Sequence, residues 1–271
     1  MNVLLFGSGG RESAFAWKIA QSQLLDELYI APGNPGVMEY GKCVDLNWNN
    51  FNHVKDFCLN KYIDMVIVGP EDPLVNGLAD YFSNTQALSH IYFIGPKKVG
   101  AQLEGSKDFS KRFMARHEIP TASYKTFRKD QVQEAVDYLK TVEAPYVLKA
   151  DGLAGGKGVV IHEDLNDAII EIKEMLADEK FGEASSQVVI EEFLEGMEFS
   201  IFVLTDGNGY FLLPEAKDYK RINEGDKGLN TGGMGAISPV PFITKSIFEE
   251  VKQNIIETTI KGLSVDKIEY V

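Results

Sequence analysis

The chain has 271 residues, 44% of them apolar and 25% charged, which is ordinary for a globular protein and long enough for two domains. Its net charge of −13 argues against nucleic acid as the main partner, and no apolar run approaches the roughly 20 residues that a membrane-spanning helix needs. The distant cysteines Cys43 and Cys58 lack metal-ligand spacing, so we expect reduced thiols in a cytoplasmic protein.

The first hundred residues alternate between strand and helix patterns. The N-terminal segment has no basic stretch before its short apolar run, so it is predicted to be a strand rather than a signal peptide. Four strands are predicted, each ended by a loop rich in glycine or proline: Val3–Phe6, Leu28–Ile30, Met65–Val68 and Tyr92–Ile94. This pattern predicts an open, mostly parallel α/β sheet, which binds ligands outside the carboxyl ends of its strands.

A second region begins near residue 105. Ser106 is predicted to cap a helix that runs to about His117, and later helices are predicted at Asp130–Lys140, Leu165–Ala177 and Lys245–Lys261. Strands are predicted at Ser123–Phe127 and Gln187–Glu191, and Glu198–Leu204 is expected to pair with Tyr210–Pro214 around the turn DGNG. The segment Asp218–Pro239 is predicted to be rich in loops.

The most informative segment is VLKADGLAGGKGVVI, at residues 147–161. Two β-branched apolar runs flank a loop with four glycines, with Lys149 at the start of the loop and Lys157 inside it. Glycines let backbone N–H groups approach phosphate oxygens, and lysines donate charge-assisted hydrogen bonds to them. The segment therefore predicts a strand–loop–strand hairpin that closes over a nucleoside triphosphate, although a plain flexible hairpin shares the pattern.

Other glycine-rich phosphate sites fit less well. After the first strand, the dinucleotide fingerprint needs a glycine where Glu12 stands and an acidic residue where Ala31–Gly33 stands. That turn predicts either a tight strand-to-helix connection or a phosphate-bearing small ligand at the helix N-terminus. In the later loop, Gly158 follows Lys157 where a Walker A site has Ser or Thr, and no HRD or DFG motif of a protein kinase follows.

The segment EEFLEG, at residues 191–196, lies between two predicted strands. Its backbone can present a donor and an acceptor to the edge of an adenine, as a hinge between subdomains does, but an acidic turn is the simpler alternative. Glu198 follows on the next strand, where a carboxylate can hold the hydroxyl groups of a ribose.

Together these segments resemble the ATP-grasp enzymes, and within them the phosphoribosylamine–glycine ligase (glycinamide ribonucleotide synthetase) family. The matching segments cover essentially the whole chain and follow the family's order: GSGGRE, APGNPG, VGPEDPLVNGLAD, LEGSKDFSKRFMARHEIPTA, LKADGLAGGKGV, VIEEFLEGMEFS and NTGGMGAISP. Several of these motifs are close to family-specific, so the resemblance is stronger than any single glycine motif.

The resemblance implies an N-terminal α/β substrate domain at residues 1–104 and an ATP-grasp fold (α+β) at residues 105–271. Within the latter it implies a mobile glycine-flap subdomain at about 122–190 and a truncated, incomplete C-terminal end. The implied enzyme is an ATP-dependent ligase of de novo purine biosynthesis. It joins glycine to 5-phosphoribosylamine through a glycyl phosphate and releases glycinamide ribonucleotide, ADP and phosphate. Such a reaction depends on positioning and electrostatics rather than on a covalent nucleophile.

By matched position, the resemblance also implies three groups of site residues. The ATP-binding residues would be Lys107, Lys149, Gly152, Gly155, Gly156, Lys157, Gly158, Glu191, Phe193, Leu194 and Glu198. The substrates would be held by Gly9, Gly10, Arg11, Glu12, Asn34, Glu71, Pro73, Asp218, Lys220, Arg221, Asn230, Thr231, Gly232 and Gly233. The catalytic residues would be Lys149, Lys157 and Arg221.

The sequence departs from the family's pattern in two motifs. Ser13 stands where the family's REHA motif has histidine, and Lys217 and Tyr219 replace the glutamine and the histidine of its QDHKR motif. Because the basic pair Lys220-Arg221 remains, we expect contact with phosphate to remain.

The resemblance further implies that Mg²⁺ or Mn²⁺ accompanies ATP. The family's metal ligands, a Glu and an Asn of an EFN-type segment, are expected beyond Val271, and no substitute pair of carboxylates is evident within the chain. Since such a cation stabilises the charge that develops on the phosphates, we expect the isolated chain to bind nucleotide weakly without turnover, and to be part of a longer protein.

Two other interpretations stay open. The first is another ATP-grasp ligase, such as a carboxylase or a formate-dependent relative, although the NTGGMG and GPEDPL segments count against it. The second is a nucleotide-binding fragment without catalytic activity.

Overall fold

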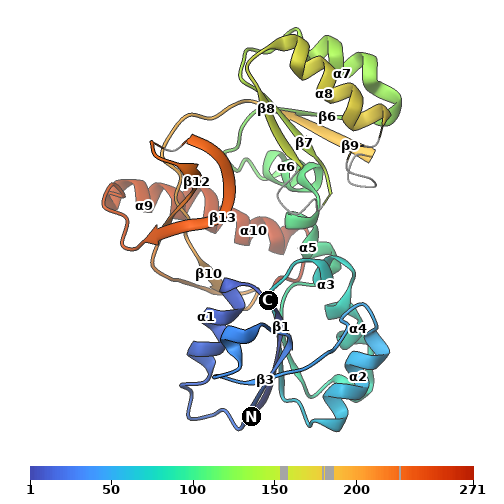
Figure 1. The fold of residues 1–271 in the computed structure, drawn as a ribbon, viewed down its shortest axis with the longest axis vertical. Coiled ribbons are helices and arrows are strands. Elements are labelled where there is room, and N and C mark those ends of the chain that lie inside the picture. Colours follow the sequence, from blue (N-terminus) through green and yellow to red (C-terminus); the bar gives the residue numbers. More distant parts are fainter. Residues whose placement is uncertain (153–157, 179, 181–185, 226) are drawn as a thin grey trace. The chain divides into compact units, whose positions relative to one another are not determined.

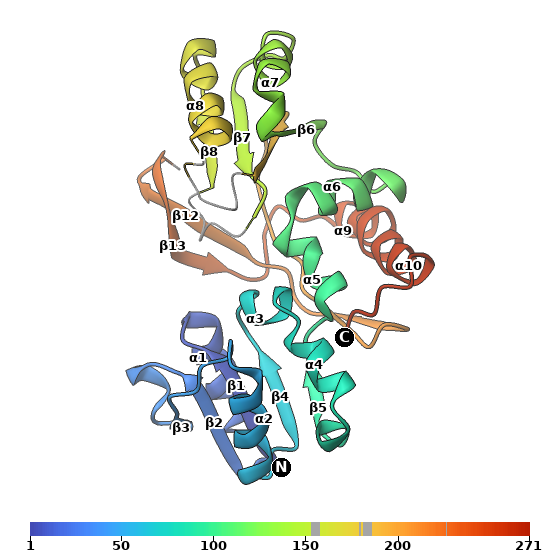
Figure 2. The same cartoon turned by 90° about the vertical axis from the view of Figure 1, so that its right-hand side faces the viewer.

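The computed structural model of the chain describes residues 1–152, 158–178, 180, 186–225 and 227–271. Within these ranges the chain divides into two compact units, Met1–Ser106 with Glu269–Val271, and Lys107–Ile268 (Figures 1 and 2). No helix of the described residues is both long enough and apolar enough to cross a membrane.

The first unit is built on a parallel five-stranded sheet, as the sequence predicts. Its strands follow the order β3-β2-β1-β4-β5. They are β1 (Asn2–Gly7), β2 (Glu27–Pro32), β3 (Lys42–Cys43), β4 (Met65–Val68) and β5 (Tyr92–Ile94). Because β1 pairs with both β2 and β4, their carboxyl ends lie together at the centre of the sheet.

Helices cover both faces of this sheet. They are α1 (Gly10–Ile19), α2 (Phe51–Asn60), α3 (Asp72–Val75), α4 (Leu78–Asn84) and α5 (Lys98–Gly105). Successive side chains of a strand point to opposite faces. Accordingly, Val3 and Leu5 pack in the cluster that includes Ala16 of α1, whereas Leu4 and Phe6 pack with residues of α2 and α4. The side chains on both faces of β1 are therefore apolar, as expected for a strand that is covered on both sides.

The second unit contains an antiparallel sheet of order β6-β9-β7-β8. Its strands are β6 (Tyr124–Arg128), β7 (Tyr146–Ala150), β8 (Val159–His162) and β9 (Gln187–Glu191). Helices α7 (Val132–Leu139) and α8 (Leu165–Ala177) pack on the sheet through a core that contains Phe127, Leu148 and Ile172 (Figure 1). The predicted glycine hairpin is confirmed, because Lys149 of β7 pairs with Val159 of β8.

The remaining elements of this unit include helix α6 (Lys107–Arg116) and two further strand pairs. These pairs are β10 (Val203–Thr205) with β11 (Tyr210–Leu212), and β12 (Lys217–Asn223) with β13 (Lys227–Ile237). The last helical stretch runs through α9 (Lys245–Val251), a π-helical segment (Lys252–Glu257) and α10 (Thr258–Val265).

Ser106 lies between α5 and α6 in an extended conformation (φ −137°, ψ 116°), and α6 begins at Lys107, directly after the predicted capping residue. Two expectations about local structure need correction. The segment 218–239 is not rich in loops but forms most of β12 and β13, which pair with each other. The strand predicted from residue 198 begins at Val203.

Candidate functional site

A buried carboxylate and two lysines form a polar cluster in the second unit. Glu191, the last residue of β9, places its Oε2 atom 2.9 Å from Nζ of Lys149 on β7 and 3.2 Å from Nζ of Lys111 on α6. The side chains of Glu191 and Lys111 are 6% and 7% exposed, whereas that of Lys149 is 27% exposed. A buried charge is costly unless it is paired, and here each one is paired. Lys149 is the member of the cluster that reaches solvent.

The end of β7 gathers more of the predicted ATP-binding residues. Nζ of Lys107, at the start of α6, donates a hydrogen bond to the carbonyl oxygen of Gly152 at 3.2 Å. The backbone N–H of Ala150 donates to the carbonyl oxygen of Gly158 at 2.7 Å, which closes the base of the hairpin. Lys107, Gly152 and Gly158 therefore lie around the strand that carries Lys149. Gly155, Gly156 and Lys157 fall outside the described residues.

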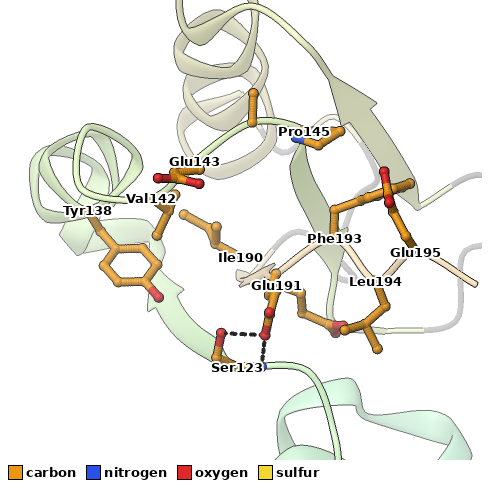
Figure 3. Close-up of a pocket in the computed structure, with 12 residues that line it drawn as sticks. Ser123, Tyr138, Val142, Glu143, Pro145, Ile190, Glu191, Phe193, Leu194 and Glu195 are labelled. Carbon is orange, nitrogen blue, oxygen red and sulfur yellow. Dashed lines mark hydrogen bonds between the residues drawn. The ribbon is translucent and has the colours of Figure 1, made fainter.

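A cavity of about 580 Å³ opens where β9 ends (Figure 3). Tyr138 and Val142 line one side of it, and Phe193 and Leu194 line the other. Apolar walls of this kind suit a planar aromatic ring. The carboxylate of Glu191 is turned toward the lysines, so what this residue offers near the cavity is its backbone.

The chain just before Phe193 is held firmly. Glu192 accepts hydrogen bonds from the backbone N–H of Ser123 at 3.1 Å and from its hydroxyl at 2.9 Å (dashed lines in Figure 3). These two bonds, the backbone one first, hold the pKa of Glu192 below its usual value. In return, the N–H of Glu192 donates to the carbonyl oxygen of Ser123 at 2.9 Å.

Beyond this anchor, the backbone leaves the sheet. Within the described ranges, no hydrogen bond engages the backbone groups of Phe193 or Leu194. Backbone groups that lie unpaired beside a cavity form a donor and acceptor set that a heteroaromatic base can use. The cavity combines apolar side chains with these backbone groups, and Glu143, Glu192 and Glu195 also line it.

A second polar cluster lies on β12. Nζ of Lys220 is 3.4 Å from Oε1 of Glu198 and 3.5 Å from Oδ2 of Asp218. Asp218 and Lys220 are two residues apart and so share one side of the strand. The two departures from the family's motif share the other side, where Nζ of Lys217 lies 5.1 Å from the ring centroid of Tyr219. The substituted residues thus contact each other and leave the Asp218–Lys220 cluster intact.

The glycine run of β13 leaves open space above its backbone. A Cβ atom placed on Gly232, Gly233 or Gly235 would meet no other atom within 4 Å, and Gly233 has a φ of 127° that favours glycine. Thr231 ties this run to β12, because its hydroxyl donates to the carbonyl oxygen of Lys220 at 2.9 Å. The backbone of Asn230 is opposite Arg221, whose guanidinium donates to the carbonyl oxygen of Gly228 at 2.7 Å.

In the first unit, Glu12 is used inside the fold. Its residue is 4% exposed, and its carboxylate accepts from the N–H of Gly9 at 2.7 Å and from Nε of Arg11 at 3.2 Å. It occupies the space that side chains would need at two glycines, since a Cβ atom on Gly7 or Gly69 would lie 2.3 or 2.2 Å from it. Glu12 therefore shapes the loops after β1 and β4 rather than facing solvent.

The side chain of Asn34 is also occupied. Its amide donates to the carbonyl oxygen of Ser8 at 2.9 Å and to the hydroxyl of Ser13 at 3.1 Å, and its oxygen accepts from the N–H of Gly36 at 2.7 Å. Ser13, which replaces the family's histidine, is thus one of its partners. Asn34 joins the two glycine loops to each other.

Arg11 and Glu71 remain exposed at the carboxyl ends of the central strands. Nη2 of Arg11 lies 4.0 Å from Oε2 of Glu71, and both line a cavity of about 320 Å³ within the first unit. Pro73, in contrast, is buried in α3. A crevice at this edge, where strand order reverses, is where parallel α/β sheets bind ligands.

Two family models together match every residue of the chain. The N domain of phosphoribosylglycinamide synthetase matches residues 1–104, and the ATP-grasp (A) domain of the same enzyme matches residues 105–271. The chain belongs to the phosphoribosylglycinamide synthetase family. The resemblance inferred from its motifs, and the α/β and ATP-grasp fold class that follows from it, are therefore confirmed.

Individual members of the phosphoribosylglycinamide synthetase family are also similar. The phosphoribosylamine–glycine ligase of Pasteurella multocida is 46% identical over 98% of this chain and 61% of its own, and that of Rhizobium meliloti is 48% identical over 97% and 61%. The crystal structure of phosphoribosylamine–glycine ligase from Thermotoga maritima superposes with a TM-score of 0.81 at 31% identity, over 100% of this chain and 63% of that one. The chain thus spans about 61% of the length of the curated relatives it matches.

Among the described residues, no group of three or more His, Cys, Asp or Glu side chains is arranged to hold a metal ion. The cluster of Glu198 and Asp218 is already compensated by Lys220. The residues described therefore do not fit a metal centre of their own.

Sequence reasoning missed three residues that shape the second unit's site. Lys111 was not singled out, although it lies one helical turn after Lys107 in the same motif, which puts both lysines on one face of α6. Ser123 and Tyr138 line the cavity through packing of α7 and β6 against β9, and nothing in their local sequence marks them.

Proposed function

We propose that this chain carries the ATP- and substrate-binding elements of a ligase that joins glycine to 5-phosphoribosylamine. The products are glycinamide ribonucleotide, ADP and phosphate, and the reaction is a step of purine biosynthesis. Membership of the family along the whole chain supports this assignment. The observation that carries it is the partly exposed ammonium group of Lys149, which is paired with the buried carboxylate of Glu191. Glu191 also lines the cavity at the end of β9, so the lysine and the cavity lie at the same end of the sheet.

In this proposal, the cavity at the end of β9 receives the adenine ring. Phe193 and Leu194 supply apolar contact and backbone hydrogen bonds, and Glu198 holds the ribose hydroxyl groups. Lys149 and Lys107 contact the phosphates, because an ammonium group beside a phosphate oxygen forms a strong charge-assisted hydrogen bond. The glycine-rich segment from Gly152 to Gly158, with Gly155, Gly156 and Lys157, is proposed to cover the same phosphates.

The substrates are assigned to two other groups of residues. The cavity of Arg11 and Glu71 takes the phosphoribosylamine, with its phosphate near the N–H groups of Gly9 and Gly10 at the start of α1. Asp218, Lys220, Arg221 and the glycine run of β13 take the glycine and the reacting groups. Glu12 and Asn34 contribute by fixing the loops, as their internal hydrogen bonds indicate.

The chemistry requires a carboxylate oxygen of glycine to attack the γ-phosphorus of ATP and displace ADP. The amine of phosphoribosylamine then attacks the resulting acyl phosphate and releases phosphate. Lysine and arginine side chains stabilise the charge on the phosphate oxygens, and no protein nucleophile is needed. We expect Mg²⁺ or Mn²⁺ to accompany ATP, where such a cation neutralises phosphate charge.

We further propose a cytoplasmic location. Cys43 and Cys58 are both free thiols, which suits a reducing compartment.

Isothermal titration and a substrate-dependence assay test this proposal. We expect weak but saturable binding of ATP to the chain alone. In a protein that continues through the expected metal-ligand segment, we expect release of ADP that glycine stimulates and that bicarbonate or formate does not. Mass spectrometry of the products should then reveal glycinamide ribonucleotide once phosphoribosylamine is added. Stimulation by bicarbonate or formate in place of glycine would instead assign the chain to another ATP-grasp ligase.

A further inference from the structure

Lys111 is the most enclosed lysine of the polar cluster. Its Nζ atom lies 2.9 Å from the hydroxyl oxygen of Thr121, 3.1 Å from the carbonyl oxygen of Ala122 and 3.2 Å from Oε2 of Glu191. Thr121 and Ala122 accept two of the three protons of its ammonium group, and Glu191 faces it as an ion pair. With 7% of its side chain exposed, Lys111 lacks the access to bind a ligand directly.

Lys149 differs from Lys111 although both pair with the same carboxylate oxygen. Its one hydrogen bond within the described ranges is to Glu191, at 2.9 Å, and 27% of its side chain is exposed. Two of its protons are therefore available to an anion. Lys111 is therefore the interior lysine of the cluster, and Lys149 is the lysine that can face a ligand.

The charges of the cluster depend on this sharing. Two ammonium groups and one carboxylate leave one net positive charge, which is presented through Lys149. Without Lys111, Lys149 and Glu191 alone would be neutral as a pair, and the carboxylate would hold Lys149 as its single partner. A neutral pair attracts phosphate far less than a cluster with a positive charge.

Lys111 also acts on the chain beside the cavity. Thr121 and Ala122, which its ammonium group binds, directly precede Ser123, and Ser123 is hydrogen-bonded to Glu192. Lys111 thus contacts both Glu191 and the segment that anchors Glu192. The side chain of Lys111 therefore helps to fix Glu191 and Glu192, the residues at which β9 ends and the cavity wall begins.

We infer that Lys111 is a positioning residue of the nucleotide site. By sharing the carboxylate of Glu191, it keeps Lys149 oriented and only partly neutralised, so that its ammonium group is available to the phosphates of a nucleoside triphosphate. This inference rests on the function proposed above and adds to it a residue that touches neither ATP nor the reacting atoms.

The decisive experiment compares Lys111→Met with the double variant Lys111→Met/Glu191→Gln by titration with ATP. The single change replaces the cation with an uncharged side chain of similar length, and we expect it to raise the dissociation constant for ATP about tenfold. The second change removes the carboxylate that then neutralises Lys149, and we expect it to restore the affinity to within about threefold of the unmodified chain.

If Lys111 contributes only to packing, the double variant should not regain affinity for ATP relative to Lys111→Met. In that case the double variant binds ATP at least as weakly as Lys111→Met, and this result overturns the inference, as does an unchanged affinity in the single variant. If Lys111→Met does not fold, as judged by circular dichroism, the double variant carries the test, because it leaves no unpaired buried charge. A loss of tenfold or more in the double variant then overturns the inference.

Lys140→Met is the matched control. Lys140 lies in the same unit, at the end of α7, and its partner is the exposed Asp137. We expect the affinity of the Lys140→Met variant for ATP to equal that of the unmodified chain. An equal loss of affinity in Lys140→Met would mean that net charge alone explains the effect of Lys111→Met, and would also overturn the inference.

Chemical labelling separates this inference from the proposed function. We expect acetic anhydride to modify Lys149 several-fold more slowly in Lys111→Met, because the unshared carboxylate of Glu191 then engages its ammonium group alone, and the double variant should regain the original rate. Peptide mass spectrometry reads the rate, with Lys140 of the unmodified chain as reference. If the unmodified chain binds no ATP, the proposed function fails, whereas an unchanged rate for Lys149 overturns the inference about Lys111.

Discussion

Polar residues of the predicted binding motifs have different roles in the two units of the molecule. In the first, the carboxylate of Glu12 and the amide of Asn34 are fully engaged in holding loops together. In the second, buried partners hold Lys149 in place while its ammonium group stays accessible. The comparison teaches that a polar residue in a binding motif can serve the loop that forms the site and not the ligand itself. The hydrogen bonds that its side chain makes within the fold distinguish the two roles.

The largest expected effect concerns the loop around Glu12. Gly7→Ala adds a Cβ atom 2.3 Å from the side chain of Glu12 at a φ of 132°, so we expect unfolding to cost about 3–4 kcal/mol less. Both tryptophans, Trp17 and Trp48, belong to the first unit. Their fluorescence during urea unfolding therefore measures this loss.

Gly10→Ala is the control for that variant. A Cβ atom at Gly10 meets nothing within 4 Å and lies in α1, so we expect unchanged or slightly greater stability, by about 0.5–1 kcal/mol. Equal stability of Gly7→Ala and the unmodified chain would show that the loop yields easily, and the contrast between the units would lose its basis.

The next effect concerns the second unit. Lys149→Ala removes an accessible cation while Glu191 keeps Lys111 as a partner, so we expect ATP affinity to fall by about 1.5–3 kcal/mol. Titration calorimetry measures this loss, and the tryptophan-detected unfolding of the first unit should not change. An unaltered affinity would remove Lys149 from the nucleotide site.

A smaller effect concerns the anchor at Glu192. Because hydrogen bonds from Ser123 hold the pKa of Glu192 below its usual value, their stabilisation is present at neutral pH and is lost as the pH falls through the lowered value. Ser123→Ala removes the hydroxyl donor, so the pKa of Glu192 should move back up toward its usual value. A carbon-13 NMR titration of the carboxylates measures the change.

Asp206 provides the internal reference for this titration. Backbone N–H groups of Gly209 and Asn208 hold its pKa below the usual value in the β10–β11 turn, which Ser123 does not contact. The pKa of Asp206 should stay constant when Ser123 is replaced. A shift of both carboxylates together would indicate a wider rearrangement rather than the loss of one hydrogen bond.

The smallest effect concerns the two departures from the family's motif. Lys217→Gln with Tyr219→His removes a cation–π contact at an accessible site, worth about 0.5–1 kcal/mol. Since the pair lies on the side of β12 away from Asp218 and Lys220, we expect ATP affinity to stay the same. A clear change in affinity would place this side of the strand at the site.

The sequence predicts the strands and helices that apolar pattern alone specifies. Met65–Val68, Tyr92–Ile94, Gln187–Glu191 and Leu165–Ala177 have the predicted boundaries, because each is a compact apolar or periodic run between turn residues. The parallel sheet and the glycine hairpin follow from the order of such runs.

What escapes prediction depends on partners that are distant in the chain. β13 carries the run NTGGMG, whose glycines have low strand propensity, and its pairing with β12 has no local signal. Lys111 and Glu191 lie 80 positions apart, so the pattern does not show that one neutralises the other. The buried state of Glu12 depends equally on Gly69, which belongs to another strand end.

The fit of Glu12 against Gly7 and Gly69 also constrains how this protein can change over generations. A side chain at Gly69 would collide with the carboxylate of Glu12, so it becomes acceptable only after position 12 has acquired a shorter residue. A shorter residue at position 12, in turn, removes the acceptor of the Gly9 N–H. A first substitution at either position 12 or position 69 is therefore destabilising, and we expect a side chain at position 69 only together with a shorter residue at position 12.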